Sequence, residues 1–239
     1  SRMVKDVIQQ LQQDVALHLT QLIEKRTSDS RLKEAMLYAV QSGGKRIRPL
    51  LTLAVGASGT SRNKAALDLA GALEMIHTYS LIHDDLPGMD DDDLRRGRPT
   101  VHKAFDEATA ILAGDALLTL AFEVAANANL EANQLVEAVK ILSTASGMSG
   151  MISGQMKDIA SEEATITLEE MKEIHREKTG ELLLAAVRLG NLFVLDSKMK
   201  EAFVSYATHF GLAFQIQNDL QDVCWTSEQT GKETGKDSE

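Results

Sequence analysis

Residues 72–100, ALEMIHTYSLIHDDLPGMDDDDLRRGRPT, decide the fold because an apolar run leads straight into a cluster of charges. Residues 72–83 carry one acid, Glu74, and no lysine or arginine. Six aspartates then fall within residues 84–93, and three arginines follow by residue 98. An apolar stretch of this kind indicates a buried helix that ends at the acids.

The aspartates are more than a solvated loop in this setting. Charge runs are usually wet surface segments, but those commonly lie in polar surroundings. Two carboxylates 5 Å apart repel by about 3 kcal/mol at an effective dielectric constant near 20. A chain that gathers such groups at the end of a buried segment is therefore expected to bind a cation.

The ligand types point to a hard cation and an anionic substrate. Oxygen-only ligands select Mg²⁺ or Ca²⁺, and the spacing differs from that of an EF-hand loop. Asp84 and Asp85 end the helix, and Pro87-Gly88 must bulge the chain so that Asp90 returns to the same side. The Arg95 and Arg96 guanidiniums suit phosphate oxygens. Metal and arginine together predict a polyanionic substrate.

Composition limits the other possibilities. The chain has 239 residues, of which 44% are hydrophobic and 4% aromatic, and it has three prolines, which favours helices. A net charge of −10 argues against a general nucleic-acid or anionic-membrane surface. The single cysteine, Cys224, rules out an internal disulfide and fits a reducing compartment. With no secretory signal and no uncharged apolar run of about 18 residues, we expect a cytoplasmic protein without a membrane span.

Hydrophobic periodicity predicts one all-α domain, a helical bundle over residues 1–239. Thr167 and Glu170 form a possible capping box, and no convincing strand pattern occurs. The polar tail ends abruptly, so we expect the natural chain to continue beyond Glu239 into closing helices. The predicted helices are an amphipathic N-terminal one carrying Val4, Ile8, Leu11, Val15, Leu19 and Leu22, then 31–40, one starting near Pro49, 62–86, 106–127, 132–156, 167–190 and 197–224.

Three further segments carry candidate ligands. In FQIQNDLQD, Gln215, Asn218, Asp219 and Asp222 share one helical face and could form a second wall of a metal site. GGKRIR places Lys45, Arg46 and Arg48 at a helix start, where anions are favoured. EKTGE places Lys178 and Thr179 in a helix rich in acids and leucine. Taken singly, an acidic stripe of this kind is more often the solvated side of a surface helix, and each of the two basic segments is more often part of a surface salt bridge.

Taken together, these segments resemble the trans-isoprenyl diphosphate synthase family, and most closely the bacterial-type farnesyl diphosphate synthases. The matching stretches are GGKRIRP, EMIHTYSLIHDDLPGMDDDDLRRGRPT, ILAGDALL, REKTGELL and FQIQNDLQD, which span nearly the whole chain. The resemblance implies a single polyprenyl synthase domain with a deep central apolar pocket. It also implies that isopentenyl diphosphate attacks an ionised allylic diphosphate, dimethylallyl or geranyl, and that a proton is then lost.

The resemblance also assigns roles to residues. It implies that Asp84, Asp90 and Asn218 hold metal, with Asp85 supporting, and that the catalytic set is Asp84, Asp85, Asp90, Arg95 and Lys178. It implies about three Mg²⁺ ions per active site, which Mn²⁺ could replace. The substrate-binding residues it implies are Lys45, Arg48, His77 and Arg96 for isopentenyl diphosphate, and Arg95, Lys178, Thr179, Gln215 and Lys232 for the allylic diphosphate or its cation.

Product length depends on the residues before the aspartates. Farnesyl-producing relatives carry an aromatic residue five positions before the first aspartate, which here is Tyr79, followed by small Ser80. The resemblance therefore implies a C15 product. Without the resemblance, Tyr79 would be read as an ordinary core aromatic and His77 as a satisfied core histidine.

The sequence departs from the family pattern at one position and leaves alternative functions open. The second acidic motif has Asn218 where the family usually has aspartate, so a metal there would bind more weakly. A geranylgeranyl diphosphate synthase shares the chemistry. A regulatory subunit of a heterodimeric prenyltransferase would typically lack the intact aspartates, and a terpene cyclase would lack the second diphosphate site at Lys45, Arg48 and Arg96. The family is homodimeric, which the sequence alone does not establish.

Overall fold

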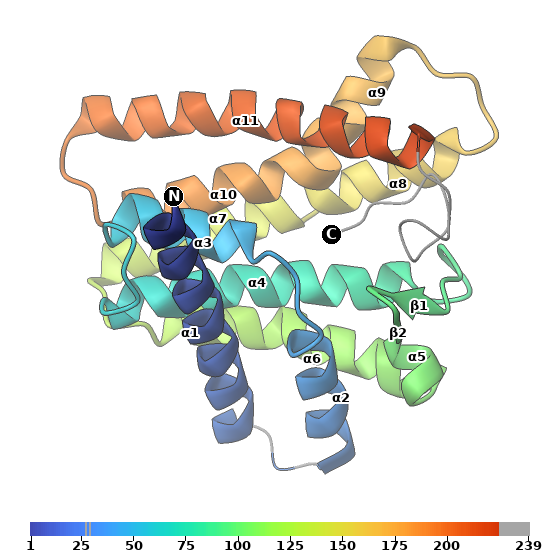
Figure 1. Ribbon diagram of the computed structural model, residues 1–239, viewed down its shortest axis with the longest axis horizontal. Coiled ribbons are helices and arrows are strands. Elements are labelled where there is room, and N and C mark those ends of the chain that lie inside the picture. The colour runs from blue at the N-terminus through green and yellow to red at the C-terminus, as the bar shows by residue number, and fades with distance from the viewer. Residues whose placement is uncertain (27, 29, 225–239) are drawn as a thin grey trace.

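The computed structural model describes residues 1–224 except 27 and 29, and for residues 211–224 it describes only the helical backbone. In this part the chain is helical apart from one two-stranded ribbon (Figure 1), which confirms the predicted all-α class. The elements are α1 Arg2–Arg26, α2 Ser30–Val40, α3 Ile47–Gly56, α4 Lys64–Asp84, β1 Leu94–Arg95, β2 Arg98–Pro99, α5 Val101–Ala104, α6 Glu107–Ala126, α7 Ala132–Ser146, α8 Met151–Ser161, α9 Leu168–His175, the π-helical turn η1 Arg176–Gly180, α10 Glu181–Asn191 and α11 Ser197–Cys224.

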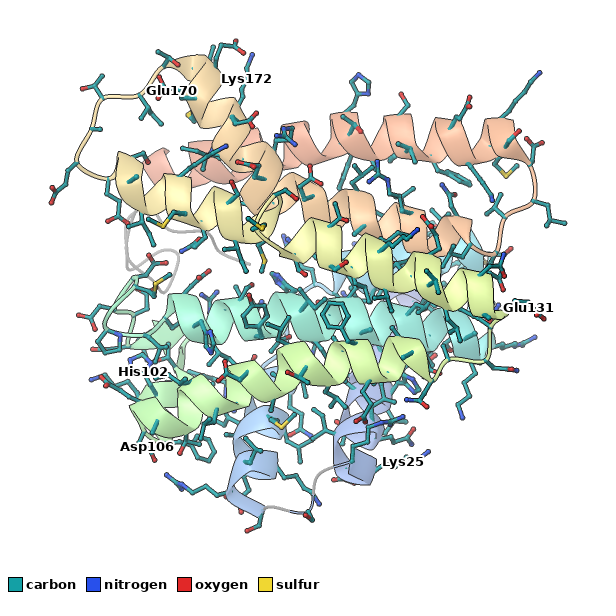
Figure 2. The ribbon with its side chains drawn as sticks, turned by 180° about the vertical axis from the view of Figure 1, so that it is seen from behind. Lys25, His102, Asp106, Glu131, Glu170 and Lys172 are labelled. Carbon is teal, nitrogen blue, oxygen red and sulfur yellow. The ribbon has the colours of Figure 1, made fainter. Side chains whose placement is uncertain are left out.

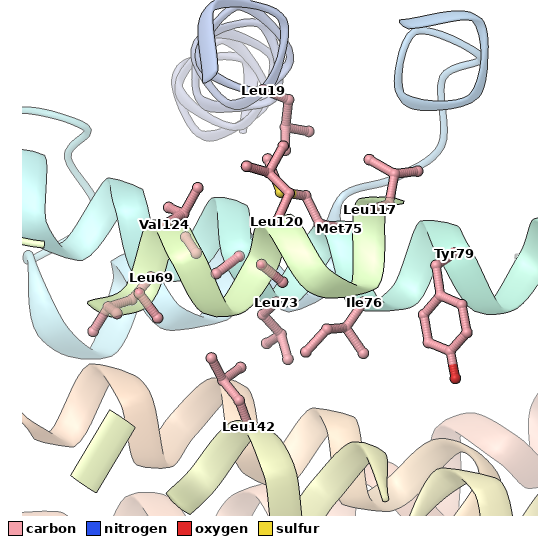
Figure 3. Close-up of a cluster of buried hydrophobic side chains, with 14 of the residues drawn as sticks. Leu19, Leu69, Leu73, Met75, Ile76, Tyr79, Leu117, Leu120, Val124 and Leu142 are labelled. Atoms are coloured by element: carbon pink, nitrogen blue, oxygen red, sulfur yellow. The ribbon is translucent and has the colours of Figure 1, made fainter. Parts of the chain in front are cut away.

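Helix α4 runs through the centre of the bundle and ends at the aspartates. Asn63 caps its first turn by accepting a hydrogen bond from the Ala66 amide. Residues 69–79 are buried without interruption, so this part of the helix has no solvent face. A helix that is apolar all round is stable only when neighbours surround it. Figure 3 shows Leu69, Leu73 and Ile76 of α4 among side chains from α1, α6 and α7.

Helix α6 is the one helix in the described chain whose length and composition would allow it to cross a membrane. Its Ala110, Ala113, Leu117 and Ala121 face the core, and it packs along α4. At Gly114 the His83 side chain of α4 lies so close to α6 that a Cβ would lie 2.2 Å from its Nε2. Packing against α4 thus accounts for the apolar character of its inner face.

The structure corrects two expectations about secondary structure and one about burial. The helix expected over 132–156 is two helices, because Gly147 and Gly150 adopt extended or irregular backbone between α7 and α8. The strands β1 and β2 were not expected: Arg96 and Gly97, with φ values of 50° and 75°, form a two-residue turn that pairs Arg95 with Arg98. On α1, Val4 and Ile8 are exposed although Leu11 to Leu22 of the same face are buried.

The helix expected over 167–190 is present but interrupted. Thr167 accepts a hydrogen bond from the Glu170 amide and caps α9, as its sequence predicts. Between α9 and α10 the backbone widens into the π-helical turn η1, which carries Lys178 and Thr179. Single π turns inside helices often lie at functional sites because they re-aim side chains.

Candidate active site

The aspartate loop folds back on the end of α4. After Asp84 the chain bulges through Pro87 and Gly88, and the Asp90 amide then donates to the Asp84 carbonyl at 2.8 Å. The Asp92 amide donates to the Asp85 carbonyl at 3.0 Å. The return of Asp90 that the Pro-Gly pair predicted is therefore present, and it brings Asp90 close enough for its charge to act on the Asp84 carboxylate.

The electrostatics of this loop favour a bound cation. Burial, with smaller contributions from the charges of Asp90 and Asp85, raises the pKa of Asp84 to about 7 against the opposing effect of Lys178 and Arg95. Burial also raises the pKa of Asp85. Arg95 opposes this shift, because its Nε and Nη2 donate hydrogen bonds to the two Asp85 carboxylate oxygens at 3.0 and 2.8 Å. A divalent cation would relieve the repulsion between Asp84 and Asp90, and oxygen-only donors suit Mg²⁺. The residues present thus fit Mg²⁺.

The Asp84 pKa leads to a titration prediction. In the metal-free protein, ¹³C NMR of labelled aspartates should show one carboxyl with a midpoint near 7, absent in Asp84→Asn. Because the folded-state pKa lies above the unfolded 3.8, this group's contribution to stability is full below about pH 4 and is lost as the pH rises through 7. A midpoint near 4 for the resonance that Asp84→Asn removes would contradict the burial argument.

A basic pocket of about 40 Å³ lies next to the aspartate loop, between α2, α3 and β1–β2. Gly44 has φ of 108°, and a Cβ there would lie 2.8 Å from the Arg96 guanidinium. Glycine at this position therefore lets the Arg96 side chain lie against the backbone. Exposed Lys45 lines the same pocket. Positive charge is thereby concentrated at one opening, as an anion site requires.

The inner wall of the basic pocket is fully buried. Arg48 Nη1 lies 3.4 Å from His77 Nε2, which joins α3 to α4. Arg46, in the left-handed conformation, donates from Nη1 to Glu74 at 2.8 Å and from Nη2 to the Val40 carbonyl. Glu74 was noted in the sequence only as the single charge of an apolar run. A lone acid in such a run was the available signal that a buried cation pairs with it.

A second cavity of about 330 Å³ opens on the other side of Arg48 and His77, which line both. Asp84 lies in its wall together with Tyr79 and Ser80. The Tyr79 ring meets His83 edge-on, with 5.4 Å between ring centres. The apolar residues that line this cavity, which matches the expected apolar pocket, are Leu81, Met89, Met151, Ile152, Met156, Ile159 and Leu182.

Lys178 and Thr179 reach this cavity from the π turn. Lys178 Nζ donates to Asp158 of α8 at 2.6 Å, a partner that the sequence did not single out. The backbone of η1 lies close against α8: a Cβ at Gly154 would lie 2.4 Å from the Lys178 amide. Glycine at this position therefore lets α8 approach the turn that aims Lys178.

The remaining predicted residues fall where side chains are not described. Gln215 and Asn218 belong to the helical backbone of α11, with Asp219 and Asp222 in the same helix. Lys232 lies outside the described residues. The structure thus brings together Asp84, Asp85, Asp90 and Arg95 at the aspartate loop, Lys45, Arg48, His77 and Arg96 at the basic pocket, and Tyr79, Ser80, Lys178 and Thr179 at the apolar cavity.

Comparison with known proteins agrees with this geometry. The farnesyl diphosphate synthase of Geobacillus stearothermophilus is 44% identical over 238 residues, covering 98% of this chain and 80% of the relative. The geranylgeranyl diphosphate synthase of Cyanophora paradoxa is 45% identical over 216 residues, covering 89% and 72%.

A solved structure matches the fold as well. The geranyltransferase of Helicobacter pylori, crystallised with magnesium and isoprenyl diphosphate, superposes with a TM-score of 0.82 at 36% identity, covering 96% of this chain and 80% of that one. The family model described as polyprenyl synthetase matches residues 29–239. With these matches spanning most of its length, the chain belongs to the polyprenyl synthetase family.

Proposed function

We propose that this chain makes farnesyl diphosphate by condensing isopentenyl diphosphate head to tail with dimethylallyl or geranyl diphosphate. The observation that carries the proposal is the pair of adjoining sites that share Arg48 and His77, one basic and one an apolar cavity with Asp84 in its wall. A reaction between two diphosphates needs two anion sites side by side. The farnesyl diphosphate synthases among the relatives support the product assignment.

The basic pocket is assigned to isopentenyl diphosphate. Lys45 and Arg96 stand at its opening and Arg48 at its inner wall, so the diphosphate can be held at one end. His77 and Arg48 also border the apolar cavity, so a diphosphate held in the basic pocket would lie next to the site assigned to the allylic substrate. Holding two reactants in this orientation lowers the entropic part of the barrier.

The allylic diphosphate is assigned to the aspartate side. Asp84 and Asp90, and Asn218 by its motif position, would hold about three Mg²⁺ ions, or Mn²⁺ in their place, which neutralise the leaving diphosphate. Asp85 orients Arg95 through its two-pronged pairing. Lys178 and Thr179, together with Gln215 and Lys232 by their motif positions, steady the diphosphate or the cation. The apolar cavity excludes water from the carbocation, which would otherwise be quenched.

Further properties are proposed from the family rather than from geometry. A homodimer and a cytoplasmic location fit the relatives and the single cysteine. A single polyprenyl synthase domain accounts for the match over residues 29–239.

The deciding experiment supplies the protein with Mg²⁺, isopentenyl diphosphate and dimethylallyl diphosphate and measures product length. A C15 product supports the proposal. A C20 product favours the geranylgeranyl alternative, which the 45% identity to the Cyanophora paradoxa enzyme keeps open. A cyclised hydrocarbon, or no condensation by the folded protein, would contradict a prenyltransferase assignment.

Tyr79 is expected to limit chain length. Its ring lies in the wall of the apolar cavity and is 7% exposed, so Tyr79→Ala should add room for another isoprene unit at a stability cost of about 3 kcal/mol. The expected product is geranylgeranyl diphosphate or longer, identified by chromatography. Tyr206→Ala, an exposed tyrosine of α11, is the matched control. An unchanged farnesyl product would show that another residue sets the limit.

Asn218 is expected to weaken one metal site. An amide oxygen can ligate Mg²⁺ but lacks the charge of the aspartate usual in the family. The Asn218→Asp variant should therefore reach its half-maximal rate at a lower Mg²⁺ concentration. An unchanged or higher Mg²⁺ requirement would make asparagine a neutral replacement here.

A further inference from the structure

Asp91, Asp93 and His102 form a cluster distinct from the carboxylates assigned to diphosphate chemistry. One carboxylate oxygen from each aspartate and one ring nitrogen of His102 all lie within 4.8 Å of one another. The two aspartates are exposed, whereas His102 is 7% exposed. Figure 2 shows His102 at the end of the bundle where α4 runs into the aspartate loop.

The hydrogen bonds around Thr100 determine which His102 nitrogen can bind a ligand. Thr100 Oγ1 donates its proton to the Asp92 carbonyl at 2.9 Å. The same oxygen lies 3.3 Å from His102 Nδ1, so it accepts from an Nδ1–H, and this assigns the tautomer. Nε2 is then left with an unshared lone pair.

Nε2 is buried, and among the described residues no hydrogen-bond partner reaches it. A buried acceptor without a donor costs free energy, so such an atom calls for a ligand. A metal-binding histidine usually donates its other ring N–H to a fixed oxygen, which is the role that Thr100 has here. His102 thus combines a ring nitrogen close to two carboxylates with a buried Nε2 that lacks a hydrogen-bond partner among the described residues.

We propose that Asp91, Asp93 and His102 bind a divalent transition-metal cation of the Mn²⁺, Co²⁺ or Zn²⁺ type, separately from the Mg²⁺ that accompanies diphosphate. One imidazole and two carboxylates suit these ions, whereas Mg²⁺ prefers oxygen ligands alone. The ion pair between Lys103 Nζ and Asp93 at 3.5 Å is exposed on both sides, so a cation can displace it at little cost.

Such an ion would stabilise the aspartate loop. Asp91 and Asp93 lie in the loop that returns Asp90 to Asp84, while His102 belongs to α5 beyond the β1–β2 ribbon. A cation shared by the three residues joins the two ends of this segment. It would hold Arg95, which lies between them, and Asp90, which directly precedes Asp91, in place. The inference does not depend on the identity of the prenyl product.

Binding of Co²⁺ alone tests the proposal. The full chain, without diphosphate and with millimolar Mg²⁺ to occupy oxygen-only sites, is titrated with Co²⁺ while visible absorption is recorded. We expect a saturable site, with affinity at least tenfold lower in Asp91→Asn, Asp93→Asn and His102→Gln. Bound Co²⁺ should also raise the melting temperature of the unsubstituted protein more than that of these variants.

Two control variants test specificity, and the two aspartate variants keep the test valid if the histidine variant fails to fold. His209→Gln and Asp6→Asn alter exposed residues elsewhere and should leave Co²⁺ affinity unchanged. Since Asp91 and Asp93 are exposed, their asparagine variants are expected to fold even if the buried His102→Gln does not. Absence of a saturable site, or a site whose affinity the two aspartate variants leave unchanged, would overturn the proposal.

Discussion

Replacing Asp84 by alanine is expected to lower kcat by about 10³-fold or more. Asp84 lies beside Asp90 at the end of α4 and lines the apolar cavity, where the allylic C–O bond is assigned to break. As that bond breaks, negative charge builds on the diphosphate; a metal held here would neutralise this charge, and the variant would offer it one ligand fewer. Steady-state rates with Mg²⁺, isopentenyl diphosphate and geranyl diphosphate measure the effect.

Two comparisons make the Asp84 result specific. Asp6→Asn, an exposed substitution on α1, should keep the full rate. Circular dichroism should show that Asp84→Ala retains its helix content, because removing a carboxylate from a repelling group does not harm packing. A rate within tenfold of the unsubstituted protein would exclude Asp84 as a metal ligand.

Replacing Glu74 by alanine is expected to lower the free energy of unfolding by about 3–5 kcal/mol. Arg46 Nη1 and Glu74 Oε2 are 2.8 Å apart, and each side chain is 5% exposed. Removal of the glutamate leaves the positive charge of the buried Arg46 guanidinium without its carboxylate partner. Arg46 lies at the start of α3, where this helix packs against α4. Urea unfolding followed by circular dichroism measures the loss.

The matched control is an exposed ion pair of the same length. Arg26 and Glu123 are also 2.8 Å apart, but Glu123 is 54% exposed, so Glu123→Ala should cost less than 1 kcal/mol. The double variant Arg46→Met, Glu74→Leu should recover much of the lost stability, since apolar residues can replace a buried pair. If Glu74→Ala lost no more than Glu123→Ala, the pair would contribute no net stabilisation.

Much of the candidate site could be predicted from local sequence. The Pro-Gly interruption required Asp90 to return, and the backbone hydrogen bond from Asp90 to Asp84 confirms that geometry. The glycines before Lys45 marked a loop, and Gly44 accommodates Arg96. These features depend on a few neighbouring residues, whose conformations steric rules restrict directly.

Partners from distant segments could not be predicted in the same way. Asp158 receives the hydrogen bond of Lys178 from twenty positions away, and nothing in GQMKD distinguishes it from other acids of a surface helix. The two-residue ribbon was also missed, because two strand residues on each side are too few to give an alternating pattern.

The sequence by itself determined the all-α class, the buried α4 and the gathering of carboxylates at its end, because helix periodicity and turn chemistry act over a few residues. Only the tertiary structure decided that Arg95 pairs with Asp85, that Arg48 and His77 separate a basic pocket from an apolar cavity, and that a π turn aims Lys178 at that cavity. Those outcomes depend on how helices cross, and helix crossings are set by the summed packing of side chains far apart in the chain.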